Sequence, residues 1–127
     1  MTQKGASGAE ANEFGHKAAE LIAQKLGAKK LGLKSNEFEL KGRRVTIRMA
    51  RLGNNQVGVL YAMLARVESV IGAFEVMPKE YELLSLSPGT YQAFMRDSRT
   101  GKGKVGLVTK KVFDAKGCSL GRVALTV

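Results

Sequence analysis

The sequence predicts a single compact α+β domain, with one mixed β-sheet, a central β-hairpin and flanking helices. Apolar residues recur at three- and four-residue spacing over residues 9–26, which indicates an amphipathic helix. Apolar and polar residues alternate over residues 44–49, which indicates a half-buried strand. Residues 70–77, VIGAFEVM, are almost continuously apolar and predict a strand buried on both faces. A length of 127 residues suits one domain.

The first predicted element is the helix of residues 9–26, and the domain is expected to span residues 9–127. Residues 1–8 are small and polar, so we expect a flexible N-terminal segment. Gly27 follows the helix and is expected to end it as a C-cap. The predicted apolar stripe consists of Phe14, Ala18, Leu21, Ile22 and Leu26.

A β-hairpin is predicted next, from strands at residues 38–40 and 45–49. A two-residue turn at Lys41-Gly42 would pair Phe38 with Val45 and Glu39 with Arg44, and both pairs are favourable across two strands. The hairpin would therefore present one apolar and one polar face.

The remaining elements follow from turn residues and shorter patterns. Residues 57–67 fit a helix or a strand, and residues 81–86 predict a strand after a turn at Pro78. Thr90 is expected to cap a short helix that ends near residue 96. Residues 105–108, 109–116 and 122–127 predict a strand, a helix and an edge strand, and this last strand offers an edge for a homodimer.

The charge of the chain points to a polyanionic partner. The net charge is +10. Residues 25–51 hold nine basic and two acidic residues, residues 96–127 hold eight and two, and the rest of the chain is mildly acidic. If both basic segments share a face, their field attracts phosphate chains, so we expect a nucleic acid, with DNA favoured over RNA. The alternatives are a basic subunit that binds RNA or an acidic protein, and charge that serves solubility alone.

Two segments supply the candidate phosphate contacts. The hairpin segment ELKGRRVTIRMAR carries arginines whose guanidinium forks suit phosphate oxygens. The segment SRTGKGKVG combines glycines and cations that can surround a phosphate, although a dinucleotide site would need a strand before it and a helix after it. Solvated surface is the alternative for both. The candidates are Lys41, Arg43, Arg44, Arg48, Arg51, Arg99, Lys102 and Lys104.

The order of these elements resembles restriction-endonuclease-like (PD-(D/E)xK) nuclease domains over residues 9–86. In such domains two carboxylates hold Mg²⁺ beside the scissile phosphate and a lysine assists. Here Asn36 stands at the position of the strand acid, and Thr46-Ile47-Arg48 stands where E-x-K would fall. Thr46 is a poor Mg²⁺ ligand and Arg48 does not lose its proton. The resemblance therefore implies a degenerate centre with no metal and no cofactor.

An active Mg²⁺-dependent nuclease is the alternative to this inactive domain. It would use Glu20 on the first helix with Glu37 and Glu39 on the hairpin, which share a face with Thr46 in the predicted register. Against it, Glu39 is expected to pair with Arg44, and Glu37 to be solvated.

The composition also bears on other protein classes. No apolar run reaches the ~20 residues that cross a bilayer, and the N-terminus lacks the apolar core of a secretory signal, so we expect no membrane partner. The single Cys118 suits a reducing cytoplasm. With His16 as the only histidine, no zinc-ligand set exists.

Overall fold

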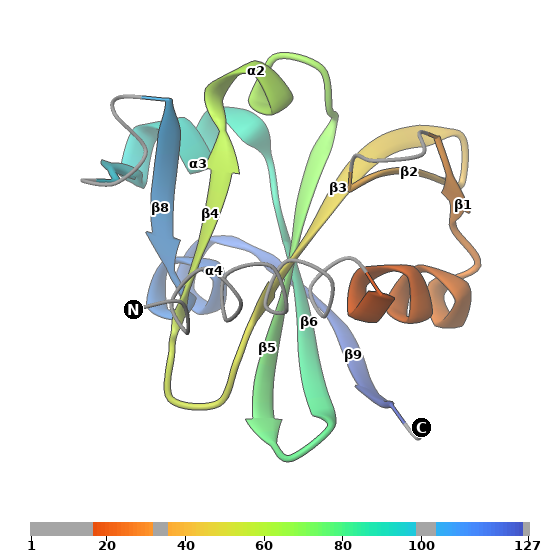
Figure 1. Ribbon diagram of the computed structural model, residues 1–127. Coiled ribbons are helices and arrows are strands. Elements are labelled where there is room, and N and C mark those ends of the chain that lie inside the picture. Colours follow the sequence, from red (N-terminus) through yellow and green to blue (C-terminus); the bar gives the residue numbers. More distant parts are fainter. Residues whose placement is uncertain (1–16, 32–35, 99–103, 126–127) are drawn as a thin grey trace, which may run out of the picture.

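The computed structural model describes residues 17–31, 36–98 and 104–125, and shows two β-sheets with short helices around them (Figure 1). The α+β class and the mixed multi-strand sheet are confirmed. The predictions for residues 1–8, for the first half of the predicted helix at residues 9–16, and for Arg99 and Lys102 lie outside the described residues.

The larger sheet has six strands in the order β1-β2-β3-β5-β6-β9. All neighbours are antiparallel except β3 and β5, which run parallel. The bounds are β1 (Lys29–Lys30), β2 (Glu37–Leu40), β3 (Arg43–Ala50), β5 (Ser69–Met77), β6 (Glu80–Leu86) and β9 (Cys118–Ala124).

A second sheet of three strands has the order β4-β8-β7 and was not predicted. Its strands are β4 (Gln56–Leu60), β8 (Val105–Thr109) and β7 (Arg96–Asp97). The helices are a described stretch at residues 17–26, then α2 (Tyr61–Leu64), α3 (Pro88–Phe94) and α4 (Lys110–Lys116). None of the helices in the described ranges is long and apolar enough to cross a membrane.

Each face of the larger sheet has its own core. On one face Val45, Ile47 and Ile71 pack against Ala19 and Ile22 of the N-terminal helix. On the opposite face the core combines residues of the larger sheet with Val57, Val59 and Val108 of the smaller sheet and with Tyr91 and Phe113 of α3 and α4. We call these the helix face and the sandwich face. Because the larger sheet is covered on both faces, residues 70–74 of β5 are buried as the apolar run predicted. The prediction is wrong for the end of the run, since Met77 is exposed.

The hairpin of β2 and β3 has the predicted register. Phe38 pairs with Val45 and Glu39 pairs with Arg44. Lys41 and Gly42 both have positive φ, 53° and 80°, as a type I′ turn requires. Gly27, with φ of 81°, follows the N-terminal helix as expected.

Some local predictions need correction. The ambiguous residues 57–67 divide into strand β4 and helix α2. Helix α3 is capped by Ser87, whose side chain accepts from the Thr90 amide at 3.2 Å, so the predicted Thr90 cap is wrong. β9 begins four residues earlier than predicted and lies at the edge of the sheet.

Candidate nucleic-acid interface

A row of polar side chains follows the sandwich face of β3. Val45 and Ile47 face the N-terminal helix, so the alternating residues Arg44, Thr46 and Arg48 face the other side. Arg44 is exposed, whereas Thr46 is fully buried and Arg48 is half-buried. The Oγ1 of Thr46 is a buried polar atom with no hydrogen-bond partner among the residues that the structure describes. We call these three residues the β3 polar row.

Arg48 is the most unusual member of this row. It lies opposite Gly72 of β5, and desolvation by burial lowers the pKa of its guanidinium, although it remains charged. Arg48 interacts electrostatically with Tyr91, a buried residue whose hydroxyl donates to the Gly106 carbonyl at 2.7 Å. No carboxylate of the described residues forms an ion pair with Arg48. A partly dehydrated charge without a counter-ion costs free energy, and a bound anion would offset that cost.

The β2–β3 turn places more cations beside the β3 polar row. Lys41, Arg43 and Arg44 are exposed there. Lys29 on β1 lies opposite Glu39 of β2. We call Lys29, Lys41, Arg43 and Arg44 the hairpin cations.

Carboxylates offset part of this positive charge. Glu37 accepts from Arg66 at 3.2 Å and lies 3.9 Å from the Nε of Arg44. Glu68 accepts from the Arg44 amide at 3.2 Å. The expectation that Glu37 is solvated is wrong, because its side chain is only 13% exposed and binds Arg66. The hairpin surface is therefore less positive than the sequence alone indicates.

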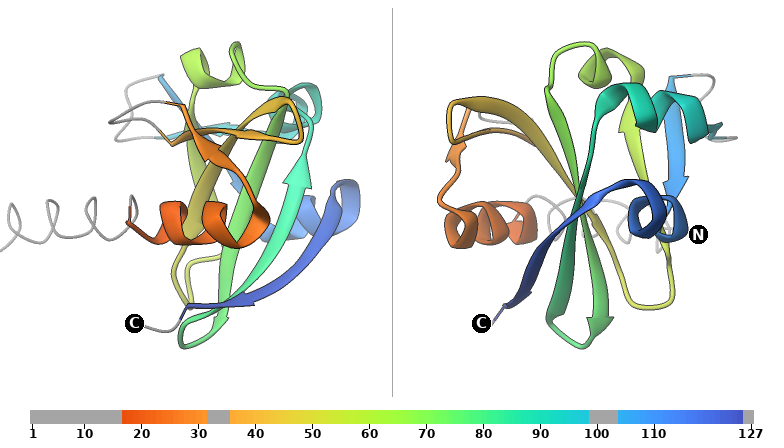
Figure 2. Two further views of the ribbon diagram at one scale, coloured as in Figure 1. Left: turned by 90° about the vertical axis from the view of Figure 1, so that its right-hand side faces the viewer. Right: turned by 180° about the vertical axis from the view of Figure 1, so that it is seen from behind.

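The other predicted cations do not join a single surface. The β2–β3 turn, α2 and the start of β8 lie in the upper half of Figures 1 and 2, but the turn and β8 lie on opposite sides of it. Lys104, just before β8, is on the β8 side, and its carbonyl accepts from the Tyr61 amide at 2.9 Å. Arg51 follows the far end of β3, where it lines a pocket with residues of the helix face. The described cations of the predicted basic site are therefore found in three places: on the β2–β3 hairpin, at Lys104 beside β8, and at Arg51 beside the helix face.

The candidate acidic residues are not gathered either. Glu20 pairs with Lys30 at 3.2 Å on the helix face, whereas Glu37 and Glu39 belong to the sandwich face. Within residues 17–31, 36–98 and 104–125, no three His, Cys, Asp or Glu side chains are grouped to hold a metal ion. Glu39 stands opposite Arg44 in the strand register as predicted, but the two side chains form no ion pair.

Arg66 is a residue of the candidate interface that was not predicted from the sequence. It follows α2 in the segment whose pattern was ambiguous, and its guanidinium reaches Glu37, 29 residues away, at 3.2 Å and 3.4 Å. Only the tertiary fold makes this pair, and no local pattern in the sequence indicates it.

Comparison of the chain with protein-family models and with curated proteins gave no match. The resemblance to restriction-endonuclease-like domains therefore stays a prediction.

Proposed function

We propose that this protein binds a nucleic acid through its sugar-phosphate backbone, with DNA favoured, using the β3 polar row and the hairpin cations. The observation that carries the proposal is Arg48, a half-buried guanidinium with no ion-pair partner among the described residues. A phosphate oxygen is a suitable counter-ion, because charge-assisted bonds from a guanidinium to phosphate are short and strong.

The length of the charged surface favours a chain of phosphates over a single anion. Arg44 and Arg48 are four residues apart on one strand, which is roughly 13 Å at about 3.3 Å per residue. Lys41 and Arg43 extend the surface beyond Arg44 at the exposed turn. Contacts of this kind position a strand and carry little sequence information, so we expect weak sequence preference.

The proposal includes no catalytic step and needs no metal or cofactor. Thr46 and Arg48 occupy the positions at which the nuclease resemblance would put a metal ligand and a catalytic lysine. We therefore propose a nuclease-like binding domain, acting in the cytoplasm, rather than an active nuclease.

Fluorescence anisotropy with labelled duplex DNA, single-stranded DNA and RNA tests this proposal. Arg44→Ala combined with Arg48→Met should weaken binding about tenfold or more, since two phosphate contacts are lost. The matched control is Lys25→Ala combined with Lys111→Ala, which removes the same charge from exposed positions on the N-terminal helix and α4. An equal loss in both variants would show that only net charge matters. Preferential binding of an acidic polypeptide over all three nucleic acids would reject the proposal.

A further inference from the structure

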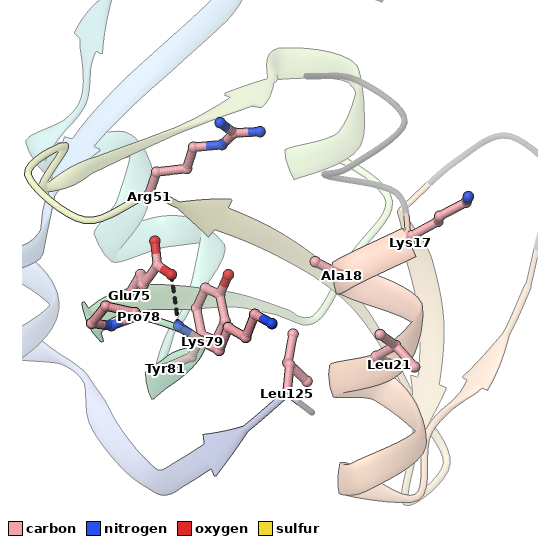
Figure 3. Close-up of a pocket in the computed structure, with 9 residues that line it drawn as sticks. All are labelled: Lys17, Ala18, Leu21, Arg51, Glu75, Pro78, Lys79, Tyr81 and Leu125. Atoms are coloured by element: carbon pink, nitrogen blue, oxygen red, sulfur yellow. Dashed lines mark hydrogen bonds between the residues drawn. The ribbon is translucent and has the colours of Figure 1, made fainter. Parts of the chain in front are cut away.

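A cavity of about 640 Å³ opens on the helix face of the larger sheet, away from the β3 polar row (Figure 3). Its wall comes from the N-terminal helix, the residue after β3, the end of β5, the β5–β6 turn, the start of β6 and the residue after β9. Its size is typical of sites for small organic ligands. The lining residues are Lys17, Ala18, Leu21, Arg51, Glu75, Pro78, Lys79, Tyr81 and Leu125.

Backbone hydrogen bonds hold the rim of the cavity in place. Glu75 accepts from the Leu52 amide through Oε1 and from the Lys79 amide through Oε2, both at 2.9 Å. The Leu125 amide donates to the Lys79 carbonyl at 2.7 Å. Three separate chain segments are thus tied together, which makes the cavity a preformed site.

The wall is largely apolar and contains one unused polar group. Ala18, Leu21, Pro78 and Leu125 provide aliphatic surface around the Tyr81 ring. Tyr81 is only 2% exposed, and its hydroxyl makes no hydrogen bond with any described residue. Burial, followed by the Glu75 charge, raises the pKa of Tyr81, so the hydroxyl stays neutral and able to donate a hydrogen bond.

The charges around the cavity are mainly positive. The Lys79 ammonium extends between Tyr81 and Leu125, and Lys17 stands on the helix opposite Arg51 (Figure 3). Lys17 and Lys79 form no ion pair with any described residue. Glu75 is the one acidic lining residue, and both its oxygens are occupied by backbone amides. An incoming negative charge would therefore meet cations and a free donor.

We propose that this cavity binds a small organic anion with an apolar body, a monocarboxylate with an alkyl or aromatic group. The apolar body would contact Leu21, Pro78 and Leu125. The carboxylate would accept from the Tyr81 hydroxyl and the Lys79 ammonium, with Lys17 adding attraction across the opening. This site is separate from the nucleic-acid interface and does not depend on that proposal.

Isothermal titration calorimetry with sodium octanoate on the full chain tests the proposal. We expect saturable binding to one site, and 1-octanol, which lacks the charge, should bind at least about fivefold more weakly. Lys17→Gln and Lys79→Asn should each weaken octanoate binding about threefold to fivefold, as expected for partly exposed charges. Asparagine suits position 79 because its φ is 64°. Tyr81→Phe should weaken binding similarly while it preserves the ring.

Lys25→Gln is the matched control, since it removes one exposed charge from the same helix outside the cavity and should leave binding unchanged. Absence of octanoate binding would overturn the proposal. The proposal would also be overturned if octanol bound as tightly as octanoate, or if Lys25→Gln weakened octanoate binding as much as the cavity variants do. Circular dichroism should show that every variant is folded.

Discussion

Arg48 is expected to lower the stability of the fold and to contribute to the proposed binding of phosphate. A half-buried charge without an ion-pair partner destabilises a fold, and an apolar side chain of similar length avoids that cost. We predict that Arg48→Met raises the free energy of unfolding by about 1 kcal/mol and weakens DNA binding at the same time. Urea denaturation measures the change in the free energy of unfolding, and the m-value should be the same in both proteins. A variant that is less stable than the parent would show that the guanidinium contributes more to folding than its burial costs.

The stability of the fold is expected to depend on pH through Glu75. Hydrogen bonds from the Lys79 amide, and then from the Leu52 amide, lower the pKa of Glu75 below its usual value of 4.5. The carboxylate therefore contributes stability above about pH 4.5, and this contribution is lost as the pH falls through the lower pKa of the folded state. Glu75→Gln should reduce the urea midpoint at pH 7, and its difference from the parent should shrink towards pH 3.

The control for this prediction is Glu80→Gln, because the Glu80 side chain makes no hydrogen bond or ion pair with described residues. Its midpoint should differ little from the parent at pH 7. A Glu75→Gln difference that stays constant from pH 7 to pH 3 would exclude titration of this carboxylate as its cause.

At the scale of elements, strand β5 depends on the absence of a side chain at Gly72. A Cβ added there would lie 2.6 Å from Phe74 and 3.2 Å from Phe113, two buried rings that pack edge to face. We predict that Gly72→Ala destabilises the protein by about 2 kcal/mol, because a tightly packed core tolerates added volume poorly. It should also disturb Arg48, which lies opposite Gly72.

Thermal denaturation compared with Gly89→Ala checks this packing effect. Position 89 lies in helix α3, and an added Cβ there meets nothing within 4 Å. The free energy of unfolding of Gly89→Ala should be unchanged or higher by up to about 1 kcal/mol, since alanine favours helices. An equally small effect at Gly72 would mean that the two rings move aside at little cost.

Elements that depend on neighbouring residues in the sequence were predictable. The positive φ of Lys41 and Gly42 is local turn chemistry, and the alternation around Ile47 is visible in the sequence. The second sheet was not predictable, because β4 and β8 pair residues that lie 45 to 53 positions apart, and the short pattern of β4 also suits a helix. Arg51 is separated from Arg44 because it follows the last residue of β3, seven positions after Arg44, where it lines a pocket on the helix face, whereas Arg44 faces the sandwich side.

At the scale of the whole molecule, the larger sheet separates two proposed binding sites. The β3 polar row belongs to its sandwich face and the octanoate cavity to its helix face. Two sites without a shared side chain are expected to be energetically independent. Saturating octanoate should therefore change DNA affinity less than about twofold, and a larger change in anisotropy titrations would reveal coupling through β3.

Salt dependence tests the whole charged surface. Each phosphate contact releases counter-ions, so the logarithm of duplex affinity should fall with the logarithm of salt at a slope of about −0.9 per contact. Contacts from Lys41, Arg43, Arg44 and Arg48 predict a slope of roughly −3 to −4. Arg44→Ala with Arg48→Met should reduce its magnitude by about 2, whereas the Lys25 and Lys111 control should leave it nearly unchanged, because those residues touch no phosphate in the proposed complex. A slope that both variants reduce equally would mean that DNA responds to net charge rather than to the hairpin end of β3.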